Sequence, residues 1–407
     1  MSTPSLLNIP YRLKAGTLYS QIPETGLGDF AVTRATSPTN NLSTRVNSLG
    51  FIERVNDNVP RLDYPLGGAV NGCPALLVEP AATNLLFRSE EFDNAYWGKV
   101  AGGVASAPVV TLNAEISPDG TMNADRVVFN LNGGVLAADI SSLESASITH
   151  AAAAHAQSVY ARTTDGTNKA FTFVTPSGSS ALITITPTWQ RFIVTGTLAA
   201  TSNFRLRLRG TEGTASSATI ALWGAQYEAG TVPTSYIPTT TAAITRAADV
   251  INKTGVSSLI GQTEGTMYVE FISPSVSAGR IYAIDNGPTI TNRISIFRET
   301  ASRRLGVIVR SKLSVTNGTI GSSAATAFNA DVPNKTAYAY KSGDYALAIN
   351  GAIAASGNLT FDFNDALSYT QIAAESGQSQ GGPIRILSLA LFPNRLTNAQ
   401  LQALTTP

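Results

Sequence analysis

The hexapeptide FRLRLR at Phe204–Arg209 alternates strictly between apolar and basic side chains. Alternate residues of a β-strand point to opposite faces, so Leu206 and Leu208 would be buried while the arginines face outward. This pattern predicts a half-buried antiparallel strand. The stretch Thr219–Tyr227 has the same period and places Trp223 on one face. The best-marked elements of the chain are therefore β-strands.

Further strands are predicted on both sides of this hexapeptide, with no helices between them. Asn350-Gly351 marks a hairpin turn, because both residue types tolerate positive φ. One short helix is predicted at 397–404, capped by Thr397. Many short strands without helices are typical of β-sandwiches and jelly rolls. The additional strands are Gln157–Arg162, Lys169–Thr175, Leu182–Thr186, Trp189–Thr195, Thr266–Ile272, Arg280–Asp285, Arg293–Arg298, Leu305–Val309, Ala337–Lys341, Tyr345–Ile349, Tyr369–Ala374 and Ile384–Leu391.

The chain has 407 residues, which is more than one ordinary sandwich needs. Three regions differ in their content of turn residues and of predicted strands. Residues 1–79 are punctuated by Pro, Gly and Asn, and their short apolar pieces would bury little surface alone. We expect them to form an extended arm with hairpins that partners order. Residues 80–242 and 243–407 each hold enough strands for a sandwich. The predicted fold is all-β: an N-terminal arm followed by two antiparallel β-sandwich, or jelly-roll, domains.

Charge composition argues against two classes of partner. Charged residues make up only 14% of the chain, and the formal net charge is +1. No field of one sign attracts nucleic acid or an anionic membrane, so neither is an expected partner. Residues 1–16 lack the apolar core of a signal peptide, and no segment has the roughly 20 apolar residues of a membrane-spanning helix. We therefore expect synthesis in the cytoplasm without signal-dependent export.

Few side chains are suited to catalysis. The single cysteine, Cys73, excludes an internal disulfide and is expected to be a small buried residue. His150 and His155 are the two histidines, and their spacing matches no zinc-protease motif, so a loop or strand-entry role is expected. The chain is predicted not to be an enzyme. Glycan cleavage by two carboxylates, which needs no histidine, stays open as an alternative.

Four residues are candidates for ligand binding. Sugars stack on exposed aromatic rings, and among the tryptophans Trp97 lies in a turn-rich stretch that suits an exposed platform. Trp189 and Trp223 are expected in the core. The row Arg205, Arg207 and Arg209 forms either a solvated sheet face or a contact to an acidic glycan or a neighbouring subunit. Three like charges in one row also predict a nearby counter-charge.

Several stretches resemble known families. The N-terminal part is similar to virion proteins of tailed bacteriophages, of the head-spike or tail-fibre type. The end of the second region resembles jelly-roll carbohydrate-binding modules, and 387–404 looks like the close of a concanavalin A or laminin-G-like sandwich. The stretches that carry the resemblance are Asp29–Thr36, Thr44–Asn47, Val59–Tyr64, Leu76–Leu86, Ser89–Trp97, Leu222–Gly230 and Thr234–Thr239.

This resemblance implies a structural protein of the virion, a fibre, spike or decoration of the capsid or tail surface that contacts host glycans. Other virion proteins would be its partners, and residues 1–79 would dock onto the particle. A homo-oligomer is implied; trimers are common among phage fibres, although no heptad repeat specifies one. A structural calcium ion also follows from the resemblance, without identified ligands, and no other cofactor is expected. The alternatives are a phage depolymerase and a bacterial lectin or adhesin.

Overall fold

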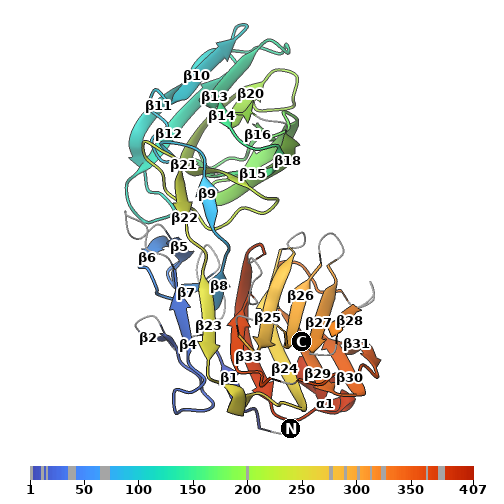
Figure 1. Ribbon diagram of the computed structural model, residues 1–407. Coiled ribbons are helices and arrows are strands. Elements are labelled where there is room, and N and C mark those ends of the chain that lie inside the picture. The colour runs from blue at the N-terminus through green and yellow to red at the C-terminus, as the bar shows by residue number, and fades with distance from the viewer. Residues whose placement is uncertain are drawn as a thin grey trace.

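The computed structural model describes residues 3–10, 13–14, 17–34, 43–64, 74–198, 201–274, 278–287, 291–299, 303–311, 314–321, 327–363, 365–374 and 381–407. The predicted burial of Cys73 concerns a residue outside these ranges. The described residues form two β-sandwiches, one above the other in Figure 1. We call the upper one the middle sandwich, because it is built from the middle of the chain. The lower one is called the terminal sandwich, because both ends of the chain build it.

The middle sandwich packs two five-stranded antiparallel sheets face to face. The sequence prediction of strands in this region is confirmed, including all six named above. One sheet has the order β10 (Trp97–Gly102), β13 (Ile140–Ser145), β20 (Arg205–Arg209), β16 (Lys169–Val174), β17 (Ser180–Ile185). The other has the order β11 (Ser106–Glu115), β12 (Ala124–Asn130), β21 (Ser217–Ala229), β15 (Ala153–Thr163), β18 (Gln190–Leu198), and a small pair joins β14 (Ile148–Thr149) to β19 (Thr201–Ser202).

Alternation along β20 produces the burial expected of it. Phe204, Leu206 and Leu208 are fully buried in the core between the two sheets. Phe173 of β16 packs on Phe204 with ring centroids 4.9 Å apart. The middle sandwich therefore has a continuous hydrophobic core of its own.

The terminal sandwich has two larger antiparallel sheets. One has the order β31 (Ala352–Gly357), β30 (Asp344–Ile349), β29 (Asn334–Lys341), β24 (Glu264–Ile272), β33 (Ile384–Phe392), β8 (Ala75–Val78), β7 (Arg61–Asp63), with β1 (Leu6–Asn8) also paired to β33. The other has the order β2 (Leu13–Lys14), β3 (Thr17–Leu18), β4 (Phe30–Thr33), β23 (Val250–Thr254), β32 (Tyr369–Ile372), β25 (Gly279–Asp285), β26 (Arg293–Arg298), β27 (Leu305–Ser311), β28 (Ser314–Gly321).

The described N-terminal residues do not form the extended arm expected from the sequence. β1 and β8 pair with β33, and β4 pairs with β23, so this region completes both sheets of the terminal sandwich. Leu76 and Phe30 are fully buried in the same core as Leu389. The arm expectation was wrong because each N-terminal strand buries little by itself, whereas its partners lie more than 200 residues away in sequence.

The chain enters and leaves the middle sandwich through one pair of strands. β9 (Ala82–Asn84) leads upward and β22 (Ile244–Arg246) returns beside it (Figure 1). A separate hairpin, β5 (Ser43–Val46) with β6 (Ile52–Val55), rises from the terminal sandwich toward the other body. The middle sandwich is therefore an insertion between strands of the terminal one.

Two local predictions are confirmed in the last region. Asn350 and Gly351 have φ of 47° and 84° and join β30 to β31. The helix α1 (Asn398–Thr405) begins after Thr397, whose side chain accepts a hydrogen bond from the Gln400 backbone in a capping box. A 3-10 turn at Ser257–Leu259 is the other helical element described. None of the helices in the described ranges is long and apolar enough to cross a membrane.

Candidate functional site

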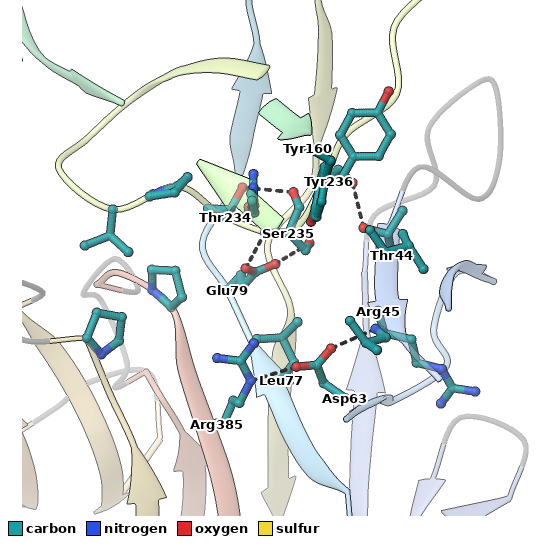
Figure 2. Close-up of a pocket in the computed structure, with 17 residues that line it drawn as sticks. Thr44, Arg45, Asp63, Leu77, Glu79, Tyr160, Thr234, Ser235, Tyr236 and Arg385 are labelled. Atoms are coloured by element: carbon teal, nitrogen blue, oxygen red, sulfur yellow. Dashed lines mark hydrogen bonds and ion pairs between the residues drawn. The ribbon is translucent and has the colours of Figure 1, made fainter. Parts of the chain in front are cut away.

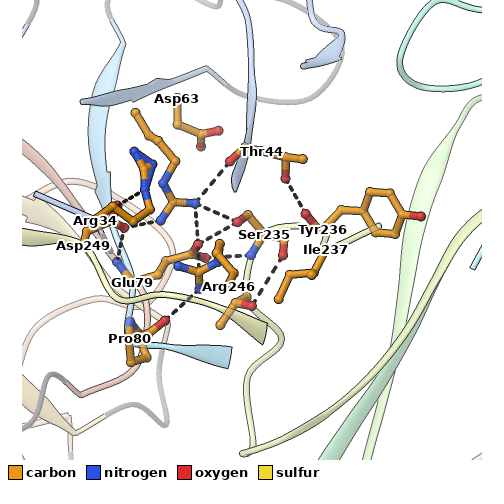
Figure 3. Close-up of polar contacts among 12 residues, drawn as sticks. Arg34, Thr44, Asp63, Glu79, Pro80, Ser235, Tyr236, Ile237, Arg246 and Asp249 are labelled. Carbon is orange, nitrogen blue, oxygen red and sulfur yellow. Dashed lines mark hydrogen bonds and ion pairs between the residues drawn. The ribbon is translucent and has the colours of Figure 1, made fainter. Parts of the chain in front are cut away.

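A cluster of buried charges joins the two sandwiches where the chain passes between them (Figure 3). Arg61 of β7 donates to Glu79 Oε2 at 2.7 Å and pairs with Asp249. Arg34 lies 3.5 Å from Asp249, and Arg246 lies 3.4 Å from Glu79. Each of these five side chains, called the junction cluster below, is at most 2% exposed. Buried charges are stable only when paired and hydrogen-bonded, as they are here.

Glu79 is held in its ionised form by this cluster. Burial alone would raise the pKa of Glu79, but the charges of Arg61 and Arg246 and hydrogen bonds from Ser235 and Arg61 lower it to about 2. Ser235, which follows β21, donates through its backbone N–H and its hydroxyl to Glu79, both at 2.7 Å. Glu79 therefore ties the end of the middle sandwich to strands of the terminal one.

Beside the junction cluster lies a pocket of about 120 Å³ that both sandwiches line (Figure 2). Asp63 of β7 accepts from the Val46 backbone at 2.8 Å and from Arg385 Nε at 2.7 Å. The Arg385 side chain is 41% exposed, so this ion pair reaches solvent. The remaining lining residues are Thr44, Arg45, Ile52, Leu77, Glu79, Tyr160, Arg191, Val232, Pro233, Thr234, Ser235, Tyr236, Pro274 and Pro383.

Two arginine–aromatic pairs run along β15 and β18 to the rim of this pocket. Arg191 of β18 pairs in register with Tyr160 of β15, and its guanidinium lies 5.5 Å from the Tyr160 ring centroid. Arg162 lies two residues further along β15, and its guanidinium is 5.4 Å from the ring of Trp189, just before β18. We call these four residues the arginine–aromatic ladder. Such contacts hold guanidinium groups flat and in place.

The ladder was not found by sequence reasoning, although both of its strands were. Tyr160 and Arg162, like Trp189 and Arg191, are two residues apart, which places each pair on one face of a strand. Only the antiparallel register of β15 with β18 brings each arginine onto the aromatic ring of the other strand. That register depends on long-range pairing, which the individual strand patterns do not specify.

The prediction of Trp97 as an exposed platform is wrong. Trp97 is 1% exposed and packs with Phe92 and Phe204, at centroid distances of 4.8 Å and 5.3 Å. Its Nε1–H donates to the Arg88 carbonyl at 2.9 Å. The turn-rich stretch before it hides the fact that Trp97 already begins β10, which pairs with β13 and turns the indole into the core.

The other two tryptophans differ from each other. Trp223 is 2% exposed, which confirms its core position. Trp189 is only half-buried: it packs against the small cluster that holds Trp223 and Tyr236, and its Nε1–H donates to the Ile116 carbonyl at 3.0 Å. Trp189 is therefore the tryptophan best placed to meet a ligand.

The arginine row of β20 carries the counter-charges expected of it. Arg205 lies 3.1 Å from Glu144. Arg207 and Arg209 share Glu212, at 2.6 Å and 3.2 Å. Burial would raise the pKa of Glu212, but hydrogen bonds from Arg207 and Ser180 lower it to about 2. These ion pairs engage N–H donors of the three arginines within the chain. The predicted contact of the arginine row with an acidic glycan stays a prediction.

The two histidines come together in space, which their spacing did not suggest. Their ring centroids are 4.0 Å apart, and His150 Nε2 lies 3.1 Å from the Tyr227 hydroxyl. Burial, and the proximity of His150, lower the pKa of His155. Within the described part of the chain neither ring contacts a carboxylate, so the pair lacks the third member of a hydrolase triad.

Two aspartates of the middle sandwich, Asp125 and Asp139, hold loops. Asp125 accepts the backbone N–H groups of Phe92 and Asn113, at 2.7 Å and 2.9 Å. Asp139 accepts those of Val104 and Leu136, at 3.0 Å and 2.7 Å. Among the described residues no group of three or more His, Cys, Asp or Glu side chains is placed to hold a metal ion. These residues therefore offer no fit for the calcium ion that the resemblance implies.

Comparison with known proteins finds no matching protein family and no matching curated protein. Among solved structures, the CBM40 of the IT-sialidase of Ruminococcus gnavus bound to α2,3 sialyllactose is 16% identical, with a TM-score of 0.32 over 37% of this chain and 86% of that chain. The NanB sialidase of Streptococcus pneumoniae is 18% identical, with a TM-score of 0.32 over 38% of this chain and 27% of its own. Domain 4 of AbnA, an arabinanase of Geobacillus stearothermophilus, is 14% identical, with a TM-score of 0.31 over 39% of this chain and 73% of that one.

Proposed function

We propose that this chain is a non-catalytic structural protein of a tailed-phage virion, a surface fibre, spike or decoration, that binds host glycans along the arginine–aromatic ladder. The observation that carries the glycan part is the ladder itself. It places two aromatic rings and two fixed guanidinium groups in a row that leads to a polar pocket. Sugars offer apolar C–H faces and hydroxyl groups. The half-buried Trp189 offers apolar surface to the first, and the guanidinium groups offer donors to the second, while Tyr160, only 6% exposed, holds Arg191 in place.

The size of the pocket decides how a glycan would lie. Pockets for drug-sized ligands measure about 300–1,000 Å³, whereas this one measures about 120 Å³. A single sugar unit or branch would enter it, beside the hydroxyl groups of Thr44, Thr234 and Ser235. The rest of the glycan would pass Arg191, Trp189 and Arg162, which are partly exposed.

The junction cluster supports binding of a ligand across both sandwiches. Its buried ion pairs and hydrogen bonds join the two sandwiches, so a ligand that touches both meets a preformed surface. A preformed surface reduces the entropy lost on binding. The virion part of the proposal rests on the sequence stretches that resemble phage proteins and on the low charged fraction of 14%.

The two carboxylates that line the pocket, Glu79 and Asp63, support the proposal that the chain is not a glycosidase. A glycosidase needs one carboxyl group that keeps its proton near neutral pH. Glu79 has its pKa lowered to about 2, and Asp63 is paired with Arg385. Incubation with host polysaccharide should release no new reducing ends, and their appearance would favour the depolymerase alternative.

Glycan binding is tested by screening the full chain against saccharides from host surfaces. Trp189→Ala should weaken binding by about five- to tenfold, because an aromatic ring stacked on a ligand contributes roughly 1–1.5 kcal/mol. Arg88→Gln is the matched control, since Arg88 pairs with Glu91 on the same sandwich away from the ladder. Equal binding by both variants and the unchanged chain would place the glycan elsewhere.

The virion role is tested on particles. Electron microscopy and protein composition of particles made without this chain should show a missing surface feature. Particles with an unchanged surface and composition would contradict the role.

A further inference from the structure

Next to the ladder, one carboxylate lies between two arginines. Glu115, at the end of β11, accepts from Arg126 Nε at 2.7 Å and from Arg162 Nη2 at 2.6 Å. Arg126 of β12 and Arg162 of β15 are both in register with Ala221 of β21, which separates them. The two guanidinium groups therefore lie on one face of the sheet, on either side of a small residue.

The charge of this group is not balanced. Glu115 neutralises one of the two arginines, so one positive charge remains. Arg126 is 44% exposed and Arg162 is 22% exposed, whereas Glu115 is 13% exposed. Among the described residues, Arg126 Nη1 and Arg162 Nε have no hydrogen-bond partner in the protein. Arg126, the more exposed of the two, therefore keeps a donor near solvent.

Trp189 provides an ordered apolar surface beside Glu115, Arg126 and Arg162. Its ring lies under the Arg162 guanidinium, and its Nε1–H is fixed on the Ile116 carbonyl. The Ile116 side chain is 52% exposed. A fixed guanidinium fork beside apolar surface suits a ligand that carries a planar anion on an otherwise sugar-like body.

We propose that Arg126 and Arg162 bind the carboxylate of an acidic saccharide, which makes the ladder selective for glycans that contain acidic sugars. This inference rests on the proposed glycan-binding function and adds the class of sugar. Each guanidinium keeps one nitrogen without a partner in the described part of the chain, and a charge-assisted hydrogen bond to a carboxylate is stronger than one to a neutral hydroxyl. Glu115 accepts a hydrogen bond from each arginine and so orients both.

The experiment uses isothermal titration of the full chain with oligogalacturonate and with its carboxyl-reduced, neutral counterpart. A sulfated neutral oligosaccharide forms the third arm and separates carboxylate from anion recognition in general. The unchanged chain should bind oligogalacturonate about tenfold or more tightly than the reduced form, since hydrogen bonds to charged groups contribute that much. Raising the salt concentration should reduce this preference.

Variants locate the effect. Arg126→Gln, which lies outside the ladder, should remove the preference for the acidic oligomer and leave binding of the reduced form within about twofold. Arg162→Gln should also remove the preference, but it should weaken binding of both forms because Arg162 belongs to the ladder. Arg88→Gln, an exposed arginine paired with Glu91 elsewhere on the sandwich, should keep the preference. Circular dichroism and the unfolding temperature check that each variant is folded.

Three outcomes would overturn the inference, each in a distinguishable way. Equal binding of the acidic and reduced oligomers would contradict the selectivity for acidic sugars but would leave the proposed glycan-binding function intact. Equal binding of the sulfated and carboxylated oligomers would replace carboxylate selectivity by general anion binding. A chain that binds no member of a panel of acidic, sulfated and neutral saccharides would overturn the proposed function together with the inference.

Discussion

At the scale of single residues, tryptophan shows how strongly role depends on position in a strand. Trp97 and Trp189 both lie at the start of a strand of the middle sandwich. Trp97 points between the sheets and is 1% exposed, whereas Trp189 lies on an outer face and is half-buried. The first side chain therefore stabilises the core, and the second is available for contact with a ligand.

Trp97→Ala is expected to lower the free energy of unfolding by about 3–5 kcal/mol, the range for a buried aromatic side chain replaced by alanine. Glycan binding by the folded fraction should not change, because the ring contacts only core residues. Urea unfolding and titration on the same sample check both effects. Trp189→Ala should show the reverse pattern, and a Trp97→Ala variant of unchanged stability would contradict the assignment.

Glu79 makes stability depend on pH. Its pKa is about 2 in the folded chain and near 4.5 when exposed, so its stabilising contribution is complete above pH 4.5 and is lost as the pH falls toward 2. The shift corresponds to roughly 3 kcal/mol. Urea unfolding between pH 7 and pH 2 should show this loss, and Glu79→Gln should flatten it. An equal acid dependence in both proteins would contradict the role of Glu79.

At the scale of elements, local turn signals were reliable and strand partners were not. The Asn350-Gly351 turn has the positive φ values that its residue types favour, and α1 begins at its capping residue. By contrast, nothing within Ala75–Val78 indicates that β8 pairs with β33. Turns and caps depend on a few neighbouring residues, whereas sheet partners depend on the whole chain.

Gly351→Ala is expected to destabilise the chain by about 1 kcal/mol, because a side chain at φ of 84° is strained. Gly98→Ala is the matched control. It lies in β10 without positive φ, and its added Cβ would meet its nearest neighbour at 3.7 Å, an ordinary contact. Thermal unfolding of both variants compares them, and an equal loss in both would contradict the argument from φ.

At the scale of the whole molecule, one sandwich is inserted into the other. The middle sandwich has a closed core, whereas the terminal sandwich draws Phe30, Leu76 and Leu389 into one core from opposite ends of the chain. The junction cluster then fixes the two bodies together, with Arg61 and Glu79 from one and Ser235 from the other. This arrangement places the ladder beside a pocket that neither sandwich would form alone.

A fragment of residues 85–241 should therefore fold by itself and unfold cooperatively. A fragment of residues 243–407 should not, because it lacks β1, β4 and β8, and the apolar edge of β33 would be exposed. Near-ultraviolet circular dichroism and thermal unfolding of each fragment, with the full chain as the control, test this. A cooperative transition in the second fragment would contradict the shared core.

The sequence alone determined that the chain is all-β, where most strands lie, and which face of β20 is buried, because these properties follow from the period of apolar residues along each strand. The tertiary structure decided that the N-terminal strands complete the terminal sandwich and that Trp97 is buried. It also decided that Arg162, Trp189 and Arg126 lie together with Glu115. These features depend on the pairing register between distant strands, which no local pattern specifies.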